Sequence, residues 1–497
     1  MLENLQIGLA TAVTAQNLLY CLIGVSLGTF FGVLPGIGAL ASVSMLMPLA
    51  LYLPPATALI MLAGVYYGAE YGGSISSILL NLPGTPSNAV TCLDGYPLAT
   101  QGKAGLALFV TTISSYIGGT IGILALFLFS PLITSVALEF GPAEFFTVIL
   151  FGLIAAATVT DGSPMKGLSM VLLGLMLGTV GADLETGVAR FTLGFDPLED
   201  GVSFIALATG LFGVSEIILS IRNSSTKHSI KHLKFWEMIP SWTEFKTTLW
   251  PTVRGAFIGV FFGALPGTGP TIASFVGYSV EKRISKQPEQ FGKGALAGIA
   301  NPESANNAAA QAAFIPTLTL GIPGSATMAI MMGALLIHGI APGPQLMHER
   351  PDLFWGLAVS FWIGNLMLLV LNIPLIGIWV NVLKIPYRLL YPAVILFVCI
   401  GAYSVQNSGF DVISVLIFGL VGSVLRLKGY HLAPILIGFV LGPMLEEYFR
   451  RSMIIFNGDF SGFQSRPVAL FFAFCAVALL VYSVLKTARS YLSKGVE

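Results

Sequence analysis

The feature that most constrains this chain is a helix-breaking motif that occurs twice inside apolar sequence. Residues 24–38 read GVSLGTFFGVLPGIG and residues 255–269 read GAFIGVFFGALPGTG, identical at nine of fifteen positions and 231 residues apart. Proline removes a backbone hydrogen-bond donor, and glycine lowers helix stability because it loses much conformational freedom. A Pro-Gly-x-Gly break that is kept twice with matching flanks indicates an internal repeat.

The sequence around the two copies is that of a membrane protein. Of the 497 residues, 55% are hydrophobic and 10% are charged, whereas soluble proteins carry roughly 25% charged residues. Apolar runs long enough to cross a bilayer recur along the chain. We therefore expect an all-α polytopic membrane protein with about 11 full spans plus two hairpins.

Several classes of function are excluded. A net charge of zero, with 24 basic and 24 acidic residues, argues against nucleic-acid binding. The four cysteines are isolated, so neither a disulfide framework nor a zinc site is indicated. The chain lacks HExxH, a nucleophile–base arrangement, a phosphate-binding loop and a dinucleotide fingerprint. We expect no enzyme and no cofactor other than Na⁺ or H⁺ as a coupling ion.

The distribution of Lys and Arg predicts how the repeats insert. Cytoplasmic loops retain basic residues, and residues 222–250 and 281–293 are both basic. The second copy therefore has both flanks on the cytoplasmic side, and we expect it to form a re-entrant hairpin at about 252–280. The flanks of the first copy contain no Lys or Arg, so its hairpin, at about 17–52, is expected to enter from the outside.

These patterns predict two inverted repeats, the architecture of many secondary transporters. The expected segments are a first repeat at 1–221 with its hairpin and a broken span at about 58–92, a basic cytoplasmic linker at 222–250, a second repeat at 251–450 with its hairpin and a broken span at about 294–338, and an extra C-terminal span and cytoplasmic tail at 451–497. Arg450 and Arg451 then fall outside, against the charge rule. The acidic residues of loop 181–201 are expected to form a solvated face there.

Each hairpin is followed by a span with a second polar break. The first reads GGSISSILLNLPGTPSNAVT (72–91), and the second reads NPESANNAAAQAAFIPTLTLGIPGSATM (301–328). Unwound backbone in hydrocarbon costs several kcal/mol for each unpaired group. It is tolerated only where protein or a water-filled cavity satisfies those groups. We therefore expect all four breaks to converge on one aqueous cavity.

Such a cavity suits a carboxylate, because helix N-termini and amide or hydroxyl donors stabilise negative charge. No Lys or Arg occurs within 24–91 or 294–338, so anion binding is expected to depend on dipoles, amides and bound cations. The expected substrate-binding residues are Pro35, Gly36, Ile37, Gly38, Asn81, Gly84, Thr85, Pro86, Ser87, Asn88, Pro266, Gly267, Thr268, Gly269, Asn306, Asn307, Gly324, Ser325, Ala326 and Thr327.

A coupling ion has two candidate locations. Unwound carbonyls near Gly36, Gly84, Gly267 and Gly324 are candidate Na⁺ ligands. Intramembrane carboxylates are functional candidates by default, which singles out Glu70 and Glu303.

The buried carboxylates, the glycines and the Pro-Gly breaks also fit purely structural roles. Glu70 and Glu303 would also fit as hydrogen-bonded structural groups. Glycines in membrane helices commonly allow close packing, and this is the expected role of Gly24, Gly28, Gly255 and Gly259. The Pro-Gly breaks would also fit as mere kinks or surface turns.

Four stretches together resemble one known family. GTFFGVLPGIG, YGGSISSILLNLPGTPSNAVT, ANNAAAQAAFIPTLTLGIPGS and ARFTLG resemble the large membrane (permease) subunit of the tripartite tricarboxylate transporters, over about residues 20–485. The resemblance implies a multi-pass protein of the bacterial inner membrane, with a cytoplasmic C-terminus, that imports citrate-like di- or tricarboxylates. It also implies an ion gradient as the driving force, a small membrane subunit, and a periplasmic binding protein that delivers substrate.

Two further points rest on analogy. Other inverted-repeat carboxylate carriers with hairpins move by an elevator mechanism, and the same alternating access is expected here. The alternative function is a channel or pore for small anions, because unwound elements at mid-membrane also build ion filters.

Overall fold

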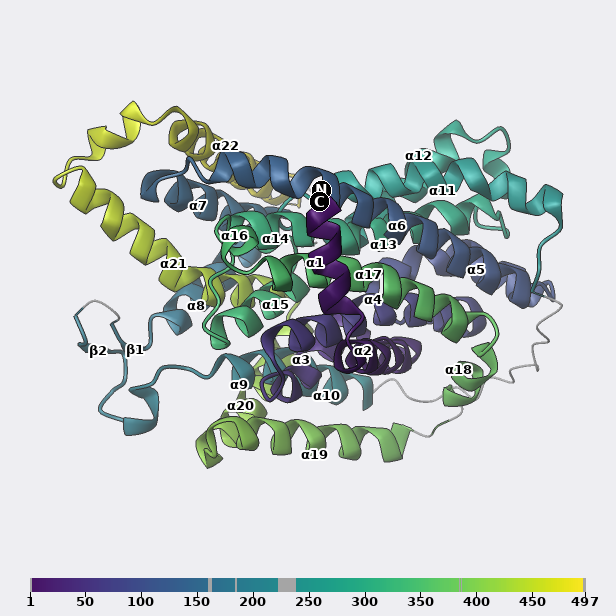
Figure 1. Ribbon diagram of the computed structural model, residues 1–497, viewed down its shortest axis with the longest axis horizontal. Coiled ribbons are helices and arrows are strands. Elements are labelled where there is room, and N and C mark those ends of the chain that lie inside the picture. Colours follow the sequence, from purple (N-terminus) through teal and green to yellow (C-terminus); the bar gives the residue numbers. More distant parts are fainter. Residues whose placement is uncertain are drawn as a thin grey trace.

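The computed structural model describes residues 2–159, 163–183, 186–221, 238–383, 385 and 387–494. This part of the chain is almost entirely helical, and most helices run along the long axis of the molecule (Figure 1). Five described helices are long and apolar enough to cross a membrane: α2 (Ala15–Val33), α6 (Ala104–Ala137), α17 (Pro351–Asn372), α20 (Gly409–Leu427) and α22 (Pro467–Lys494). The expected class, a polytopic helical membrane protein, is consistent with this architecture.

In the first half, helix breaks at residues 34–37 and 81–85 fall at the two Pro-Gly motifs. This half opens with a helix that the sequence did not indicate, α1 (Leu2–Ala12), which packs on α17. The further elements are α3 (Gly38–Ala50), α4 (Pro55–Leu80), the 3-10 turn η1 (Pro86–Asn88), α5 (Ala89–Thr100), α7 (Pro142–Val159), α8 (Pro164–Gly178), the antiparallel strands β1 (Gly181–Ala182) and β2 (Ala189–Arg190), η2 (Asp196–Leu198), α9 (Phe204–Ala208), the π-helical turn η3 (Thr209–Val214) and α10 (Ser215–Ile221).

The second half also has helix breaks at its two Pro-Gly motifs, at residues 264–268 and 321–325. Residues 222–237 of the expected linker lie outside the described residues. The elements are α11 (Trp242–Gly263), α12 (Gly269–Ile284), η5 (Pro288–Gln290), α13 (Ala297–Ala312), α14 (Phe314–Leu320), α15 (Ala326–Ile337), α16 (Leu346–Glu349), α18 (Ile376–Val382), α19 (Tyr387–Gln406), α21 (Ala433–Ile455) and η6 (Phe460–Ser465). Helix α11 starts well before the expected position 252, because Ser241 and Glu244 form a capping box that begins it earlier.

Glycines bring the first hairpin helix of each half against the broken span of the same half. A Cβ on any of these glycines would lie 2.2 to 2.5 Å from a backbone carbonyl oxygen of the span, so no larger residue fits. The contacts are Gly24 with Met61, Gly28 with Val65, Gly32 with Ala69, Gly255 with Asn301, Gly259 with Ala305, and Gly263 with Ala309. The expected packing role of Gly24, Gly28, Gly255 and Gly259 is confirmed, and Gly32 and Gly263 continue the same four-residue spacing.

Each broken span also packs on the long helix of the other half. In one direction, the Tyr71 hydroxyl of α4 donates to Asn365 Oδ1 of α17 at 3.0 Å. In the other, a Cβ on Gly118 of α6 would lie 2.2 Å from the carbonyl oxygen of Ser304 in α13. The two halves therefore interlock and share one core.

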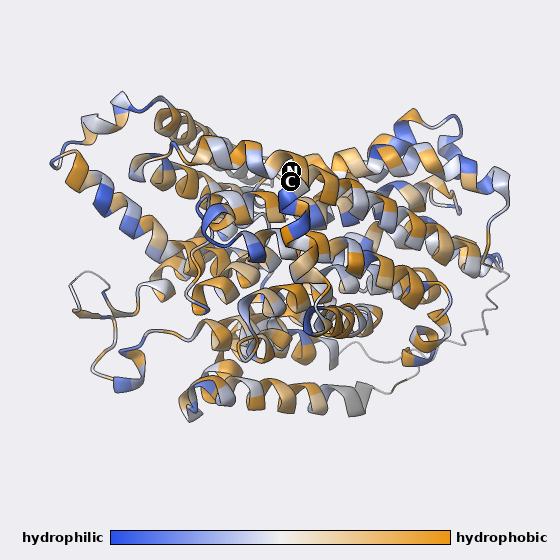
Figure 2. Ribbon diagram, viewed as in Figure 1, coloured by the Kyte–Doolittle hydropathy of each residue, from blue (hydrophilic) through white to orange (hydrophobic). Residues whose placement is uncertain are grey.

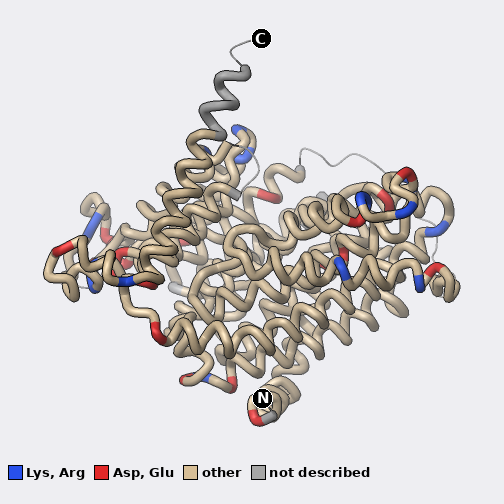
Figure 3. Tube along the Cα trace, turned by 90° about the horizontal axis from the view of Figure 1, so that it is seen from above, with Lys and Arg blue, Asp and Glu red and all other residues tan. Residues whose placement is uncertain are grey.

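Residues in loops or near helix ends that the charge pattern places on the same side of the membrane meet in space. The pairs are Tyr52 with Ser404, Gln101 with Lys293, Lys166 with Lys428, and Asp183 with Arg450. Most charged residues lie toward the ends of the long axis, while apolar residues dominate the helices between them (Figures 2 and 3).

The acidic loop at one of these ends differs from expectation. Asp183 is 5% exposed and forms ion pairs with Arg190 at 3.2 Å and Arg450 at 2.8 Å. Glu446 pairs with the same two arginines, and Arg451 pairs with Glu447. The expectation of a solvated acidic face is wrong for Asp183, because folding brings α21 against this loop.

Candidate functional site: a cavity at four helix breaks

The four helix breaks meet at one cavity of about 760 Å³. Its walls include both hairpin tips and both interrupted spans, as the sequence predicts. Thirteen of the expected binding residues line it: Gly36, Ile37, Gly38, Gly84, Thr85, Pro86, Ser87, Gly267, Thr268, Gly269, Ser325, Ala326 and Thr327.

Helix N-termini provide much of the cavity wall. Helices α3, α12 and α15 begin at Gly38, Gly269 and Ala326, and all three residues line the cavity. Helix α5 follows η1, whose residues Pro86 and Ser87 also line it. The first turns of helices have free N–H groups and a partial positive charge. Four such ends at one cavity make it suitable for an anion.

Backbone N–H groups of the unwound segments find acceptors within the protein, in another unwound segment or in a neighbouring helix. The N–H of Gly267 in the second hairpin tip donates to the carbonyl of Gly324 in the broken span, at 3.0 Å. The N–H of Gly84 donates to the carbonyl of Gly73 at 3.3 Å, and that of Gly324 to Thr317 Oγ1 at 3.3 Å. The Gly267 tip requires glycine because its φ is +82°.

Seven expected residues do not line the cavity. Pro35 and Pro266 are half-buried beside the tips. Asn81 is exposed and ends α4 in the left-handed conformation, at φ 58°. Gly321 ends α14 in the same conformation, at φ 69°. Asn88, Asn306, Asn307 and Gly324 are buried next to the lining residues.

The two buried carboxylates differ in their access to the cavity. Glu70 lines it and accepts hydrogen bonds from Thr85 Oγ1 at 2.9 Å and Ser87 Oγ at 2.5 Å. Glu303 does not line it. Its carboxylate accepts from Asn88 Nδ2 at 3.0 Å and from the Thr91 hydroxyl. Because Asn88 Oδ1 accepts from Thr85 at 2.6 Å, one hydrogen-bonded network connects both carboxylates.

Buried amides with unused hydrogen-bonding capacity lie close to this network. Asn306 is fully buried, and its side chain lies beside the Glu70 carboxylate without a well-formed hydrogen bond at either polar atom. Gln311, five residues further along α13, is 1% exposed, and neither of its polar side-chain atoms has a hydrogen-bond partner. Unpaired buried amides are costly, so these side chains are candidates for contacting a bound species.

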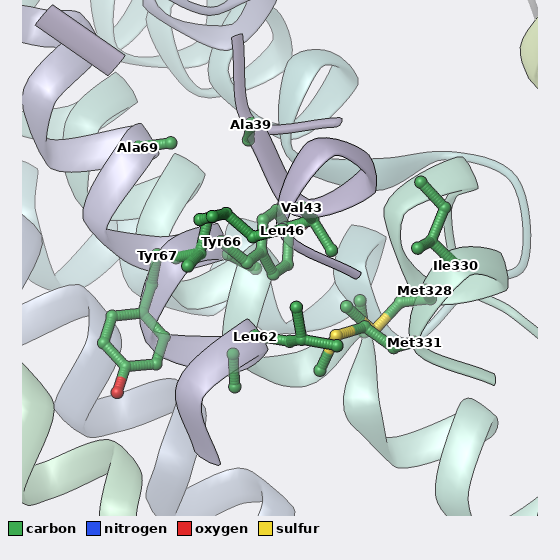
Figure 4. Close-up of a cluster of buried hydrophobic side chains, with 14 of the residues drawn as sticks. Ala39, Val43, Leu46, Leu62, Tyr66, Tyr67, Ala69, Met328, Ile330 and Met331 are labelled. Atoms are coloured by element: carbon green, nitrogen blue, oxygen red, sulfur yellow. The ribbon is translucent and has the colours of Figure 1, made fainter. Parts of the chain in front are cut away.

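An apolar cluster fixes three of the cavity-forming helices to one another. Side chains of α3 (Ala39, Val43 and Leu46), α4 (Leu62 and Tyr66) and α15 (Met328 and Met331) pack together in it (Figure 4). Tyr66 and Ala39 also belong to the cavity wall. The helix N-termini are therefore held in place by a packed core.

Sequence reasoning missed a charged pair in the cavity wall. Among the described residues, Arg426 of α20 is the only Lys or Arg that lines the cavity, and it pairs with Glu216 of α10. His431 lines the same wall. These residues lie outside the breaks, so the repeat pattern carries no signal for them. The sequence signal that could have identified this pair is Arg426, a charged residue in the last turn of the apolar helix α20.

Comparison with known proteins places the chain in a family. The model of the tripartite tricarboxylate transporter TctA family matches residues 18–437. An uncharacterized 52.8 kDa protein in the TAR-I ttuC' 3' region of Agrobacterium vitis is 46% identical over 492 residues, covering 99% of this chain and 97% of the relative. An uncharacterized protein in the TAR-II ttuC' 3' region of the same organism is 51% identical over 232 residues, which is 47% of this chain and 96% of the relative.

No solved structure matches the chain significantly. The family match covers all four helix breaks. It points to a membrane protein of a transport system rather than to an enzyme. The chain therefore belongs to the TctA family of tripartite tricarboxylate transporters.

Proposed function

We infer that this chain is the permease of an ion-gradient-driven transporter that imports small di- or tricarboxylates across the bacterial inner membrane. A periplasmic binding protein delivers the substrate, and a small membrane subunit completes the complex. The two halves act as inverted repeats, and alternating access follows an elevator mechanism. The observation that carries this proposal is the convergence of four helix N-termini on one cavity.

The cavity fits a multivalent carboxylate better than a neutral solute. Each helix end offers N–H donors and a partial positive charge, and several ends distributed around one cavity match several carboxylates on one substrate. The volume of about 760 Å³ accommodates a ligand of that size with its remaining water. Glycines and alanines at the hairpin tips let the ligand approach the backbone closely.

Ion coupling is supported by a shortage of protons around Glu70. Thr85 Oγ1 lies 2.9 Å from Glu70 Oε2, 2.6 Å from Ser87 Oγ and 2.6 Å from Asn88 Oδ1, and Ser87 Oγ lies 2.5 Å from Glu70 Oε2. These four oxygen–oxygen contacts share only two hydroxyl protons when Glu70 is ionised. An added proton or Na⁺ would supply the missing positive charge.

Glu303 has a second role in this proposal. It is buried with Glu70 in one network, and the described contacts of both carboxylates come from hydroxyls and amides. Two ionised carboxylates in that setting are unfavourable without a bound cation. Unwound backbone near Gly36, Gly84 and Gly267, which lines the cavity, offers further oxygen ligands for Na⁺.

The test is uptake by proteoliposomes that contain this subunit with its partner subunits. Citrate, succinate and acetate are supplied in turn, with Na⁺ and H⁺ gradients imposed separately. We expect saturable uptake of citrate or succinate, driven by one of the two gradients.

In the Glu70→Gln variant, gradient-driven uptake should fall at least about tenfold while the protein still folds. A neutral glutamine can neither take up the added proton nor provide the negative charge that attracts Na⁺. Glu139→Gln, at an exposed position away from the cavity, is the matched control. Flux that does not saturate, accompanied by single-channel currents, would identify a pore and reject the proposal.

A further inference from the structure

We propose that Arg426 binds a carboxylate group of the substrate, and that Glu216 occupies this arginine as an internal substitute when the cavity is empty. This inference rests on the proposed function, because it assumes that the cavity receives a carboxylate. It adds a binding residue outside the four helix breaks. It also assigns a purpose to an acidic side chain in the wall of an anion site.

The position of Arg426 makes it available to a ligand. Both partners of the ion pair line the cavity, and the Arg426 side chain remains 38% exposed. The contact with Glu216 uses Nη1, while a guanidinium carries five N–H donors in a planar fork that matches a carboxylate. A substrate carboxylate can therefore approach the same guanidinium.

Glu216 also lies close to a hairpin tip. Its Oε1 is 3.8 Å from the position that a Cβ on Gly36 would take, and Ser220 of the same helix is closer still, at 2.9 Å. Gly36 lines the cavity. One carboxylate thus faces both the arginine and the first hairpin tip, and its displacement by substrate would change the contacts of both.

A carboxylate in an anion-binding cavity needs an explanation. Glu216 adds a negative charge that would repel a carboxylate substrate, since like charges at close range are costly. That cost is reduced if Glu216 turns away from the cavity when a substrate carboxylate takes its place on Arg426. While the cavity is empty, the same residue spares the partly buried guanidinium from remaining unpaired.

The competing explanation is a clamp between helices. Helices α10 and α20 pack closely, with the Ser423 hydroxyl donating to the carbonyl of Ser215 at 3.4 Å and Gly422 against Ser215. In that role the ion pair would only hold the two helices together. The two explanations predict opposite effects of removing Glu216 on substrate binding. If the ion pair is a clamp, removing either partner weakens the protein and does not improve binding. If Glu216 competes with substrate for Arg426, removing Glu216 tightens binding.

The experiment measures binding of citrate and succinate to the purified full-length chain by calorimetry. Glu216→Gln should tighten binding severalfold, because it frees Arg426. Arg426→Gln should weaken binding about tenfold or more, since charge-assisted hydrogen bonds to a carboxylate are lost. Arg426→Lys keeps the charge without the fork and should fall between. The double variant should behave like Arg426→Gln alone. Thermal unfolding of each variant reports its fold.

The outcomes separate the two proposals. If the wild-type chain binds neither acid, with or without its partner subunits, the proposed function is wrong. If it binds and Glu216→Gln weakens binding or leaves it unchanged, Glu216 is not a substitute for substrate and this inference is overturned, while the proposed function stands. If Arg426→Gln does not fold, Arg426→Lys decides: unchanged affinity in that variant also overturns the inference.

Discussion

At the level of single residues, the repeated glycines decide how closely helices approach. Gly28 lies so near α4 that a Cβ would be 2.3 Å from the carbonyl oxygen of Val65, and Gly259 stands in the same relation to Ala305. Backbone atoms cannot move aside as a flexible side chain can. The glycine stripe is therefore a steric requirement, and a side chain there would force α2 and α4 apart.

Gly28→Ala should lower the free energy of unfolding by about 2 kcal/mol, the usual cost of overpacking a well-packed contact. Gly377→Ala is the matched control, because it lies in helix α18 with nothing within 4 Å of the added Cβ. Denaturant unfolding of the purified variants measures both. Equal stability of the two variants would contradict the steric argument.

Asn81 illustrates a residue whose role depends on backbone conformation. It ends α4 at φ 58° and ψ 30°, outside the cavity lining. Asparagine tolerates this left-handed conformation better than most residues, and glycine adopts it freely.

We therefore expect Asn81→Gly to preserve uptake and stability. Asn81→Val should destabilise by about 1–2 kcal/mol, because a branched side chain is strained in that conformation. Uptake assays alongside thermal unfolding check both variants. Loss of uptake in a stable Asn81→Gly protein would instead restore Asn81 as a binding residue.

At the level of elements, a buried aspartate ties the first broken span to the second half. Asp94 of α5 is fully buried, and its Oδ1 accepts hydrogen bonds at 2.8 Å from the backbone N–H groups of Gly292, Gly294 and Ala295. Its Oδ2 accepts from the Tyr278 hydroxyl of α12 at 3.0 Å. This carboxylate joins α5, α12 and the loop before α13, so these elements are positioned as a unit next to the cavity.

Asp94→Asn should lower the free energy of unfolding by about 3 kcal/mol, because a neutral amide oxygen would replace the charged acceptor of three N–H groups and the amide NH2 cannot accept from the Tyr278 hydroxyl. Tyr278→Phe removes only one of the four contacts and should cost about half as much. Denaturant unfolding compares the two variants. A smaller effect from Asp94→Asn than from Tyr278→Phe would show that the backbone contacts contribute little.

For the whole molecule, the orientation of the two charged ends is a prediction that can be checked directly. Loop 181–201 and Arg450 meet at one end, and residues 281–293 lie with Gln101 at the other. The charge pattern assigns the first end to the outside and the second to the cytoplasm. Loop 181–201 contacts Arg450, so these two must lie on the same side of the membrane, and the same holds for residues 281–293 and Gln101.

Leu193→Cys should therefore react with a membrane-impermeant maleimide that reaches the periplasm but does not cross the intact inner membrane. Leu193 is 94% exposed. Gln290→Cys, also exposed, should react only after the membrane is permeabilised. The parent protein with its four native cysteines provides the background. Labelling of both positions from one side would contradict the expected insertion.

Local sequence was sufficient for the features that follow from chain chemistry. The Pro-Gly breaks, the apolar runs and the glycine spacing predicted the helix class, the interruptions and thirteen residues of the cavity wall, because each reflects what a backbone can do inside hydrocarbon. Folding decided the rest. Glu216 and Arg426 stand 210 positions apart, and Asp183 and Arg450 stand 267 apart. No periodicity links such residues. Their partnership exists because packed helices place two distant side chains at one point, where an unpaired charge would be costly and a paired one is stable.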